Sequence, residues 1–326
     1  PIPCLPYGNY YFYSQDEIDN FQAGYPGCTE LKGGVKIRGN DISNLYGLNV
    51  VISIEGKLYF YGNSVLTSLD GLENLTSIGG TLQFTLNDAL VNLIGLDGLT
   101  SIGGLIIGYP QSSGGGNPAL INLMGLEGLT SIGSWLRVSG NGALTSFSGL
   151  DNVTSIGGSI EILQNHALTS LTGLDNIDAA SISHLEIINN PLLSTCEVLS
   201  ICNYLAASGS AEIRDNSIGC NSPEEVQDSC EANAVTVVER YIIENISASP
   251  NPFTTFTNLT YTLDKPENVQ FTVYNVQSQI VYVLQENQDK GAQHVQWSPE
   301  GLTAGVYYFR IQAGDMVGRG KMVKME

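Results

Sequence analysis

Apolar and polar residues recur along the first part of the chain with a fixed period that is much longer than a helical turn. The phrase G-L-x-x-L-T-S-I-G-G, or a close variant, starts at six glycines: Gly47, Gly71, Gly95, Gly125, Gly149 and Gly173. Successive starts are 24 residues apart, except for one interval of 30 residues that contains the insert "YPQSSGGG" at 109–116. A fixed period in the twenties is typical of a solenoid, in which each repeat forms one turn of a coil.

Each repeat contains one short stretch in which apolar and polar residues alternate, which is the pattern of a β-strand with one buried face. The stretches 81–84, 135–138, 159–162 and 184–187 place on that face Leu82, Phe84, Leu136, Val138, Ile160, Ile162, Leu185 and Ile187. No amphipathic helical segment lies opposite the strand in the repeat. The pattern therefore predicts a parallel, single-stranded β-solenoid, whose strands stack about 4.8 Å apart.

Glycine and asparagine each form a further column in the repeat. Where neighbouring turns approach closely, or where the backbone needs positive φ, glycine is favoured because it has no Cβ. Just after the strand, amides stacked from turn to turn are expected to hydrogen-bond to one another and to the backbone of the bend. These amides belong to Asn63, Asn87, Asn117, Asn141, Asn165 and Asn190.

The cysteines lie at the two ends of the repeat region. An open solenoid exposes strand edges at its ends, and short helical patterns at 16–21, 196–208 and 221–230 are placed to cover them. An even number of cysteines without zinc-ligand spacing predicts disulfides and an oxidising compartment. We expect one bridge before the repeats and two among the four later cysteines, for which three pairings are open. The first is Cys4–Cys28, and the later four are Cys196, Cys202, Cys220 and Cys230.

Residues 4–230 resemble the receptor L domain family. The resemblance is carried by the pattern L-x-x-I-x-G-x-L-x-I-x-x-N, the cysteine-bounded ends and the closing segment "NSIGCNSPEEVQDSC". That family is a leucine-rich, single-stranded β-helix found in receptor ectodomains and in bacterial surface proteins. The resemblance implies a β-solenoid with disulfide-stapled, partly helical caps. We assign this domain to residues 1–230 and a linker to 231–244.

The pattern changes after Cys230. Short alternating runs, separated by turn residues at intervals of about ten residues, predict an antiparallel, immunoglobulin-like β-sandwich of about seven strands. The runs are 258–263, 269–276, 279–286, 294–298, 305–312 and 321–325. The predicted fold class is therefore all-β, with a parallel β-solenoid followed by a sandwich at 245–326.

Four motifs of the sandwich resemble the C-terminal sorting domain of the type IX secretion system of Bacteroidetes. They are "SPNPF" at 249–253, "YNVQSQIV" at 274–281, "GLTAGVYYFRI" at 301–311 and "GKMVKM" at 320–325. The resemblance implies that the type IX translocon and its outer-membrane shuttle barrel recognise residues 245–326. It also implies a secreted protein that is attached to the outer membrane at the bacterial cell surface after export. The candidate sorting-signal residues are Pro250, Asn251, Pro252, Phe253, Gly305, Tyr307, Lys321 and Val323.

Charge and motifs narrow the function classes. A net charge of −19 with only 13 lysines and arginines argues against nucleic acid and against an anionic membrane surface as partners. No serine-hydrolase, zinc-protease or phosphate-loop motif occurs, so we expect no enzyme, no metal and no cofactor. A cryptic hydrolase that uses an acidic column of the repeat is an alternative. For that column we expect a solvated acidic edge rather than a calcium site; it consists of Glu73, Asp97, Glu127, Asp151 and Asp175.

The outward positions of the strands form the candidate recognition surface, because solenoids present extended binding surfaces. This face is basic and aromatic toward the N-terminal end and acidic toward the C-terminal end. We expect an adhesion protein that binds a glycan or a protein through Lys36, Arg38, Tyr59, Tyr61, Arg137 and Glu161. A solvated sheet without a ligand, as in a structural surface-coat component, is the alternative. The other outward positions are Gln83, Thr85, Ser139, Leu163, Glu186 and Ile188.

Overall fold

The computed structural model describes residues 4–5, 8–109, 115–234, 243, 246–276, 279–314 and 316–325. Two compact units make up the chain, Pro1–Val235 and Thr236–Glu326. Most of the insert at 109–116 and most of the expected linker at 231–244 lie outside the described residues.

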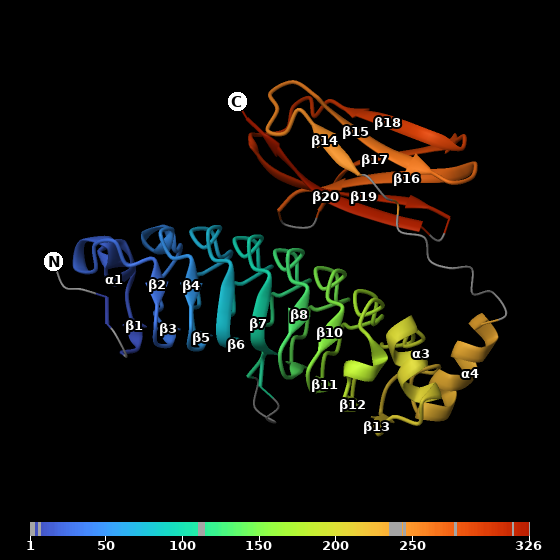
Figure 1. Ribbon diagram of the computed structural model, residues 1–326, viewed down its shortest axis with the longest axis horizontal. Coiled ribbons are helices and arrows are strands. Elements are labelled where there is room, and N and C mark those ends of the chain that lie inside the picture. Colours follow the sequence, from blue (N-terminus) through green and yellow to red (C-terminus); the bar gives the residue numbers. More distant parts are fainter. Residues whose placement is uncertain are drawn as a thin grey trace. The chain divides into compact units, whose positions relative to one another are not determined.

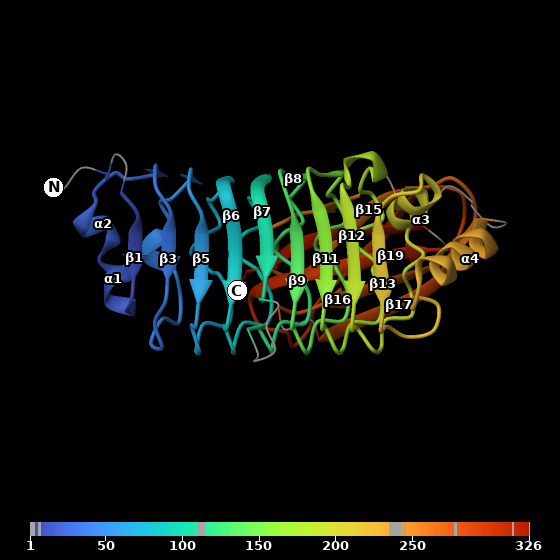
Figure 2. The same ribbon diagram turned by 90° about the horizontal axis from the view of Figure 1, so that it is seen from below.

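The first unit is a parallel β-solenoid, as the repeat predicts. One strand from each turn joins a sheet whose strands lie side by side in chain order (Figures 1 and 2). Neighbouring strands are parallel and in register, so that Leu82 pairs with Leu58 on one side and with Leu105 on the other. The strands are β1 (Tyr10–Phe12), β3 (Val35–Ile37), β5 (Leu58–Tyr61), β6 (Ser77–Thr85), β7 (Ser101–Ile107), β9 (Leu136–Ser139), β11 (Ser159–Leu163), β12 (His184–Ile188) and β13 (Ala211–Arg214).

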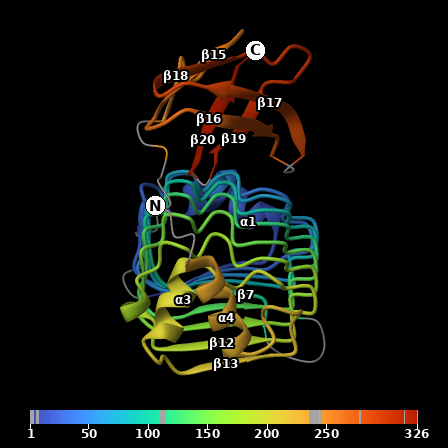
Figure 3. The ribbon, with the colours of Figure 1, turned by 90° about the vertical axis from the view of Figure 1, so that its right-hand side faces the viewer.

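A second row of parallel pairs runs along the coil, and the sequence pattern did not indicate it. Its members are two-residue strands, too short to show alternation, that pair with one another or with β6 and β7. In the described chain both rows belong to one 13-stranded sheet, and seen end-on the turns superpose (Figure 3). The short elements are β2 (Glu30–Leu31), β4 (Ser53–Ile54), β8 (Ser131–Ile132), β10 (Ser155–Ile156) and the 3-10 helices η1 (Tyr46–Leu48) and η2 (Ala179–Ser181).

A continuous apolar core fills the coil. Each of the eight inward residues predicted from the alternation is fully buried. The rings of Phe60 and Phe84 stack with their centroids 4.9 Å apart, so consecutive turns are in direct contact through the core.

The glycine that opens the repeat is required at its corner. Gly125 has φ +107, and a Cβ added there would lie 2.1 Å from the carbonyl oxygen of Leu93 in the preceding turn. Both the positive φ and the close backbone approach exclude other residues. The same geometry recurs at Gly71, Gly95, Gly149 and Gly173, as expected for a corner where turns stack closely.

The asparagine column is a buried ladder of hydrogen bonds. In Asn141, Oδ1 accepts bonds from the backbone N–H and from the Nδ2 of Asn117, each at 3.0 Å. Its own Nδ2 donates to the carbonyl oxygens of Ile107 and Ser139 and to Oδ1 of Asn165. The six predicted asparagines are fully buried, and the ladder extends one turn further than predicted, through Asn190 to Asn216.

Short helices cover both ends of the solenoid, and disulfides pin them. At the start, Cys4 bonds to Cys28. At the far end the bridges are Cys196–Cys220 and Cys202–Cys230, which selects one of the three pairings that the sequence left open. The helices are α1 (Gln15–Asp19), α2 (Phe21–Gly24), α3 (Leu199–Ala206) and α4 (Pro223–Ala234).

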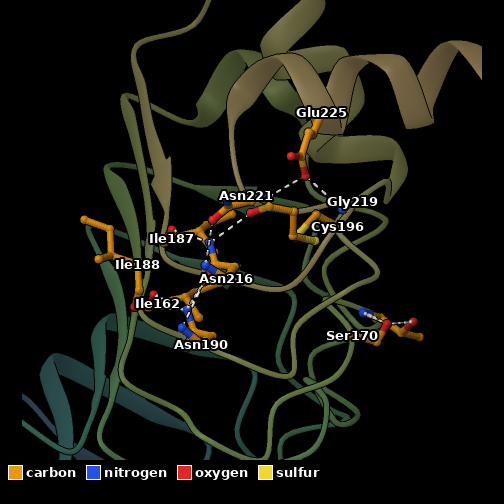
Figure 4. The surroundings of a disulfide bond; sticks show 12 residues. Ile162, Ser170, Ile187, Ile188, Asn190, Cys196, Asn216, Gly219, Asn221 and Glu225 are labelled. Atoms are coloured by element: carbon orange, nitrogen blue, oxygen red, sulfur yellow. Dashed lines mark hydrogen bonds between the residues drawn. A yellow bond between two sulfur atoms is a disulfide. The ribbon is translucent and has the colours of Figure 1, made fainter.

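The C-terminal cap closes the asparagine ladder. Figure 4 shows Asn216 next to the disulfide of Cys196, with its Nδ2 directed at backbone carbonyls. Glu225, in the first turn of α4, accepts hydrogen bonds from the backbone N–H groups of Gly219 and Asn221. The cap therefore satisfies two backbone donors of the loop that follows β13.

The second unit is an antiparallel sandwich of a three-stranded and a four-stranded sheet, as predicted. Phe271, Trp297 and Phe309 lie in the core between the sheets. The peptide bonds before Pro250 and Pro252 are both cis. The strands are β14 (Ser247–Ser249), β15 (Thr257–Leu263) and β18 (Gly291–Trp297) in one sheet, and β16 (Glu267–Tyr274), β17 (Ile280–Gln288), β19 (Gly305–Ala313) and β20 (Met316–Lys324) in the other.

Candidate functional site

The outer face of the solenoid sheet carries two columns of side chains, because the strands are parallel and in register. The first column runs from β1 to β12 through Tyr11, Lys36, Tyr59, Gln83, Ile106, Arg137, Glu161 and Glu186. The second lies two residues further along each turn and contains Tyr13, Arg38, Tyr61, Thr85, Ser139, Leu163 and Ile188.

Four outward positions that the alternation predicts to be exposed are instead buried: Gln83, Thr85, Ser139 and Ile188. Gln83 donates from Nε2 to Oγ1 of Thr85 at 3.2 Å. Strands about 4.8 Å apart place each outward side chain directly beside those of the adjacent turns: Gln83 lies between Tyr59 and Ile106, and Leu163 lies between Ser139 and Ile188. Burial on this face therefore depends on the neighbouring turns as well as on the strand pattern.

Lysine, arginine and tyrosine side chains gather on the first turns of this face, at Lys36, Arg38, Lys57, Tyr59 and Tyr61, here named the cation–tyrosine patch. Nζ of Lys36 lies 5.5 Å from the ring centroids of both tyrosines. Nζ of Lys57 lies 4.3 Å from that of Tyr59, and the guanidinium carbon of Arg38 lies 5.0 Å from that of Tyr61. All of these distances are within the range of a cation–π interaction.

The cations of the patch are not neutralised by carboxylates. Among the described residues, no Asp or Glu lies within ion-pair distance of Lys36, Arg38 or Lys57. Burial and the neighbouring charge of Lys36 lower the pKa of Lys57, while burial raises the pKa of Tyr59. The patch thus combines uncompensated positive charge with half-buried aromatic rings.

Lys57 is a member of the patch that the sequence interpretation missed. It precedes Tyr59 by two residues and Tyr61 by four, so the period of the strand already placed all three side chains on one face. The assigned strand begins only at Leu58.

Arg137 and Glu161, the other two predicted binding residues, lie further along the solenoid and neutralise each other. Nε and Nη2 of Arg137 donate to the two carboxylate oxygens of Glu161 at 2.5 and 2.9 Å. This bidentate pair raises the pKa of Arg137 and lowers the pKa of Glu161. The structure brings together Lys36, Arg38, Tyr59 and Tyr61 but keeps this ion pair apart from them in the sheet order.

The acidic column caps the glycine corners. The Glu127 carboxylate accepts the backbone N–H of Gly125 at 2.7 Å, and the other members of the column make the same bond to the glycine two residues before them. Burial, followed by the charges of Asp97 and Asp151, raises the pKa of Glu127 to about 7. In the described residues no group of three or more His, Cys, Asp or Glu side chains is placed to hold a metal ion.

The sorting motifs at the two ends of the sandwich meet in the fold, although about 70 residues separate them. Asn251 donates from Nδ2 to the carbonyl oxygen of Lys321 at 2.9 Å and accepts the N–H of Val323 at 2.8 Å. The N–H of Phe253 donates to the carbonyl oxygen of Val323 in β20, and its carbonyl oxygen accepts the N–H of Met325, the residue after β20. Asn251 and Phe253 thus clasp the last strand.

The remaining sorting-signal residues lie beside this clasp. Gly305 begins β19 and pairs with Lys324. The ring of Tyr307 contacts that of Trp297, which in turn contacts Phe253. Pro250 lies at the turn before the clasp, where its carbonyl oxygen accepts a bond from the hydroxyl of Thr257. One continuous cluster therefore joins the first, third and fourth motifs.

The sequence was compared with known proteins and families. No curated protein matches it. Among the described residues, no helix is both long enough and apolar enough to cross a membrane. Residues 247–325, which contain the whole clasp, match the family described as the secretion system C-terminal sorting domain. This sorting domain implies that the type IX secretion machinery exports the protein, which is then secreted or located at the cell surface.

Proposed function

We propose that the protein is a non-catalytic binding or adhesion protein of the cell surface, and that the cation–tyrosine patch is its ligand-binding site. One observation carries the proposal. In a chain of net charge −19, Lys36, Arg38 and Lys57 lie together over tyrosine rings without a carboxylate partner among the described residues. Like charges placed side by side destabilise the folded chain, so a ligand that neutralises them accounts for the arrangement.

A non-catalytic role is supported by the use made of the acidic column. Each carboxylate of the column accepts the backbone N–H of the glycine two residues before it, so all five serve the same structural purpose at the corner of their turn. The disulfide-pinned caps and the stacked turns of leucine support a relationship of residues 4–230 to receptor L domains.

The proposal extends to export. The type IX translocon and its outer-membrane shuttle barrel bind residues 245–326, and the exported protein is then attached at the outer membrane. The clasp of Asn251 on β20 supports this role, since it holds two motifs in one arrangement. In cells competent for type IX secretion, Asn251→Ala should leave the protein inside the cell, whereas Asn258→Ala, a matched change on β15, should be exported normally.

A binding screen tests the central proposal. The purified full chain is applied to arrays of glycans and surface proteins, together with Lys36→Gln/Arg38→Gln and a control, Lys32→Gln/Arg214→Gln. The control removes the same charge from two exposed cations that already have carboxylate partners. A ligand bound by the wild type and the control but not by the patch variant supports the proposal. Absence of any ligand, with regular deposition of the protein on cells, supports a structural coat component instead.

A further inference from the structure

We infer that the ligand of the cation–tyrosine patch is an acidic polysaccharide, a polymer of sugars that carry carboxylate or sulfate groups. The inference rests on the proposed binding function and names its ligand class. It is carried by the alternation of rings and cations across the first three strands of the outer face.

The two outer columns begin with the same order of chemistry. In the first column Tyr11 of β1 pairs with Lys36 of β3, which pairs with Tyr59 of β5. In the second column the corresponding residues are Tyr13, Arg38 and Tyr61. Each column therefore presents a ring, a cation and a ring in successive turns.

The rings at the N-terminal edge are available to a ligand. Tyr11 and Tyr13 are 51% and 52% exposed, and their rings stack with centroids 6.2 Å apart at an interplanar angle of 6°. Tyrosines on a surface supply flat apolar area with a hydroxyl at the rim. The C–H face of a pyranose ring packs against such a surface, and its hydroxyl groups bond to the rim.

The spacing of the rows suits a polymer that runs across the strands. Adjacent parallel strands lie about 4.8 Å apart, which is close to the length of one sugar residue in an extended chain. A polysaccharide lying along a column thus meets a tyrosine, a cation and a tyrosine with successive sugars. Acidic groups would reach Lys36 and Arg38, and the guanidinium of Arg38 matches a carboxylate or sulfate with two parallel hydrogen bonds.

The charge distribution of the outer face limits binding to these turns. Burial and the charge of Lys36 both lower the pKa of Lys57, and an anion between these two ammonium groups would relieve their repulsion. Further along, Arg137 is already paired with Glu161, and the same column continues with Glu186 and Glu212. These carboxylates repel a polyanion, so the site covers only a few sugars.

An acidic peptide fits the patch less well. Peptides commonly bind sheets by adding a strand to a free edge. Next to the patch such an edge lies beside β1, an end strand of the sheet, whereas β3 and β5 are paired on both sides. Only side chains are offered to a ligand over these strands. Four tyrosines match the flat faces of sugars better than they match flexible acidic side chains.

Titration with defined polymers tests the inference. Polygalacturonate and dextran sulfate supply carboxylated and sulfated sugars, neutral dextran supplies uncharged sugars, and poly-glutamate supplies an acidic peptide. By isothermal calorimetry, the full chain should bind at least one acidic polysaccharide, more weakly at about 0.5 M than at about 0.05 M salt. Affinity should fall at least about tenfold in Lys36→Gln/Arg38→Gln and stay within about twofold in Lys32→Gln/Arg214→Gln.

The variant Tyr11→Ala/Tyr13→Ala removes two aromatic rings but no charge, so it measures the contribution of stacking to affinity separately from that of the cations. Circular dichroism checks that each variant is folded. Weaker binding of the polysaccharide by this variant supports the inference. Equal binding of neutral dextran, or binding of poly-glutamate that does not need the tyrosines, overturns it. If no acidic polysaccharide binds, yet the array yields another ligand lost in Lys36→Gln/Arg38→Gln, the ligand class is wrong while the proposed binding function stands. Equal loss in the control variant overturns both.

Discussion

Replacing one asparagine in the middle of the buried ladder should destabilise the whole solenoid. Asn141→Ala removes the acceptor of the Asn117 backbone N–H and the donor to the carbonyl oxygens of Ile107 and Ser139. The Asn117 N–H has no other hydrogen-bond acceptor among the described residues. The substitution therefore leaves at least one buried donor unsatisfied and weakens the bonding of two carbonyl groups.

The expected magnitude follows from these groups. A buried polar group left without a partner costs about 1–3 kcal/mol, so we expect the free energy of unfolding to fall by about 3–5 kcal/mol. A domain is typically stable by only about 5–15 kcal/mol. Asn152→Ala is the matched control, because this exposed side chain makes one bond, to the carbonyl oxygen of Glu127; its loss should cost about 1 kcal/mol or less.

Urea unfolding followed by circular dichroism measures the loss, and hydrogen exchange with peptide resolution assigns it to the solenoid rather than to the sandwich. The ladder also predicts coupling, because Asn117→Ala and Asn141→Ala both remove the bond from Nδ2 of Asn117 to Oδ1 of Asn141. The loss in the double variant should therefore be smaller than the sum of the two single losses, by about 0.5–1.5 kcal/mol. If Asn141→Ala costs no more than Asn152→Ala, or if the double variant is additive, the ladder does not stabilise the coil as argued.

Three further changes test the corners, the acidic column and the cap. Since burial raises the pKa of Glu127 to about 7, wild-type stability should fall as pH rises from about 4.5 to 7; Glu127→Gln should remove this loss, gaining about 1–3 kcal/mol in thermal unfolding at pH 8 and little at pH 4. Gly125→Ala meets a backbone oxygen at 2.1 Å and should cost more than about 3 kcal/mol in urea unfolding, whereas Gly142→Ala meets nothing within 4 Å and should cost about 0.5 kcal/mol or less. Cys202→Ala/Cys230→Ala opens a loop with a sequence separation of 28 and should cost about 3–4 kcal/mol, read by the same unfolding assay.

The architecture could be predicted because a parallel coil repeats every requirement once per turn. Inward residues such as Leu82 and Ile160, corner glycines such as Gly125 and the amides of the ladder each recur at the period of the repeat. The cysteine positions identified the caps, but the pairing Cys196–Cys220 needed three-dimensional placement, since several pairings close loops of similar length.

Other features depend on contacts that no single turn contains. Ser139 alternates outward, but it is fully buried where it pairs with Leu163 of the next turn. The sequence predicts that the carboxylate of Glu127 belongs to a solvated acidic edge. Its hydrogen bond from the Gly125 N–H could not be predicted, because the two groups meet only when the corner is folded. In the sandwich, Asn251 and Val323 lie 72 residues apart, and no local pattern indicates that they meet.

Comparing equivalent positions in successive repeats distinguishes those that packing of the coil constrains from those that it leaves variable. Because the turns are in register, equivalent residues stack on one another. The columns that hold the coil together keep one kind of side chain from turn to turn: an amide in the ladder, glycine at the corner and a carboxylate that caps the corner. The first outer column has no such uniformity; it runs from Tyr11 through Lys36 and Tyr59 to Glu186. Stacking of the turns does not require one kind of side chain at these positions, so their chemistry is free to serve a ligand. The alternation of rings and cations in the first three turns is therefore where binding specificity is expected to lie.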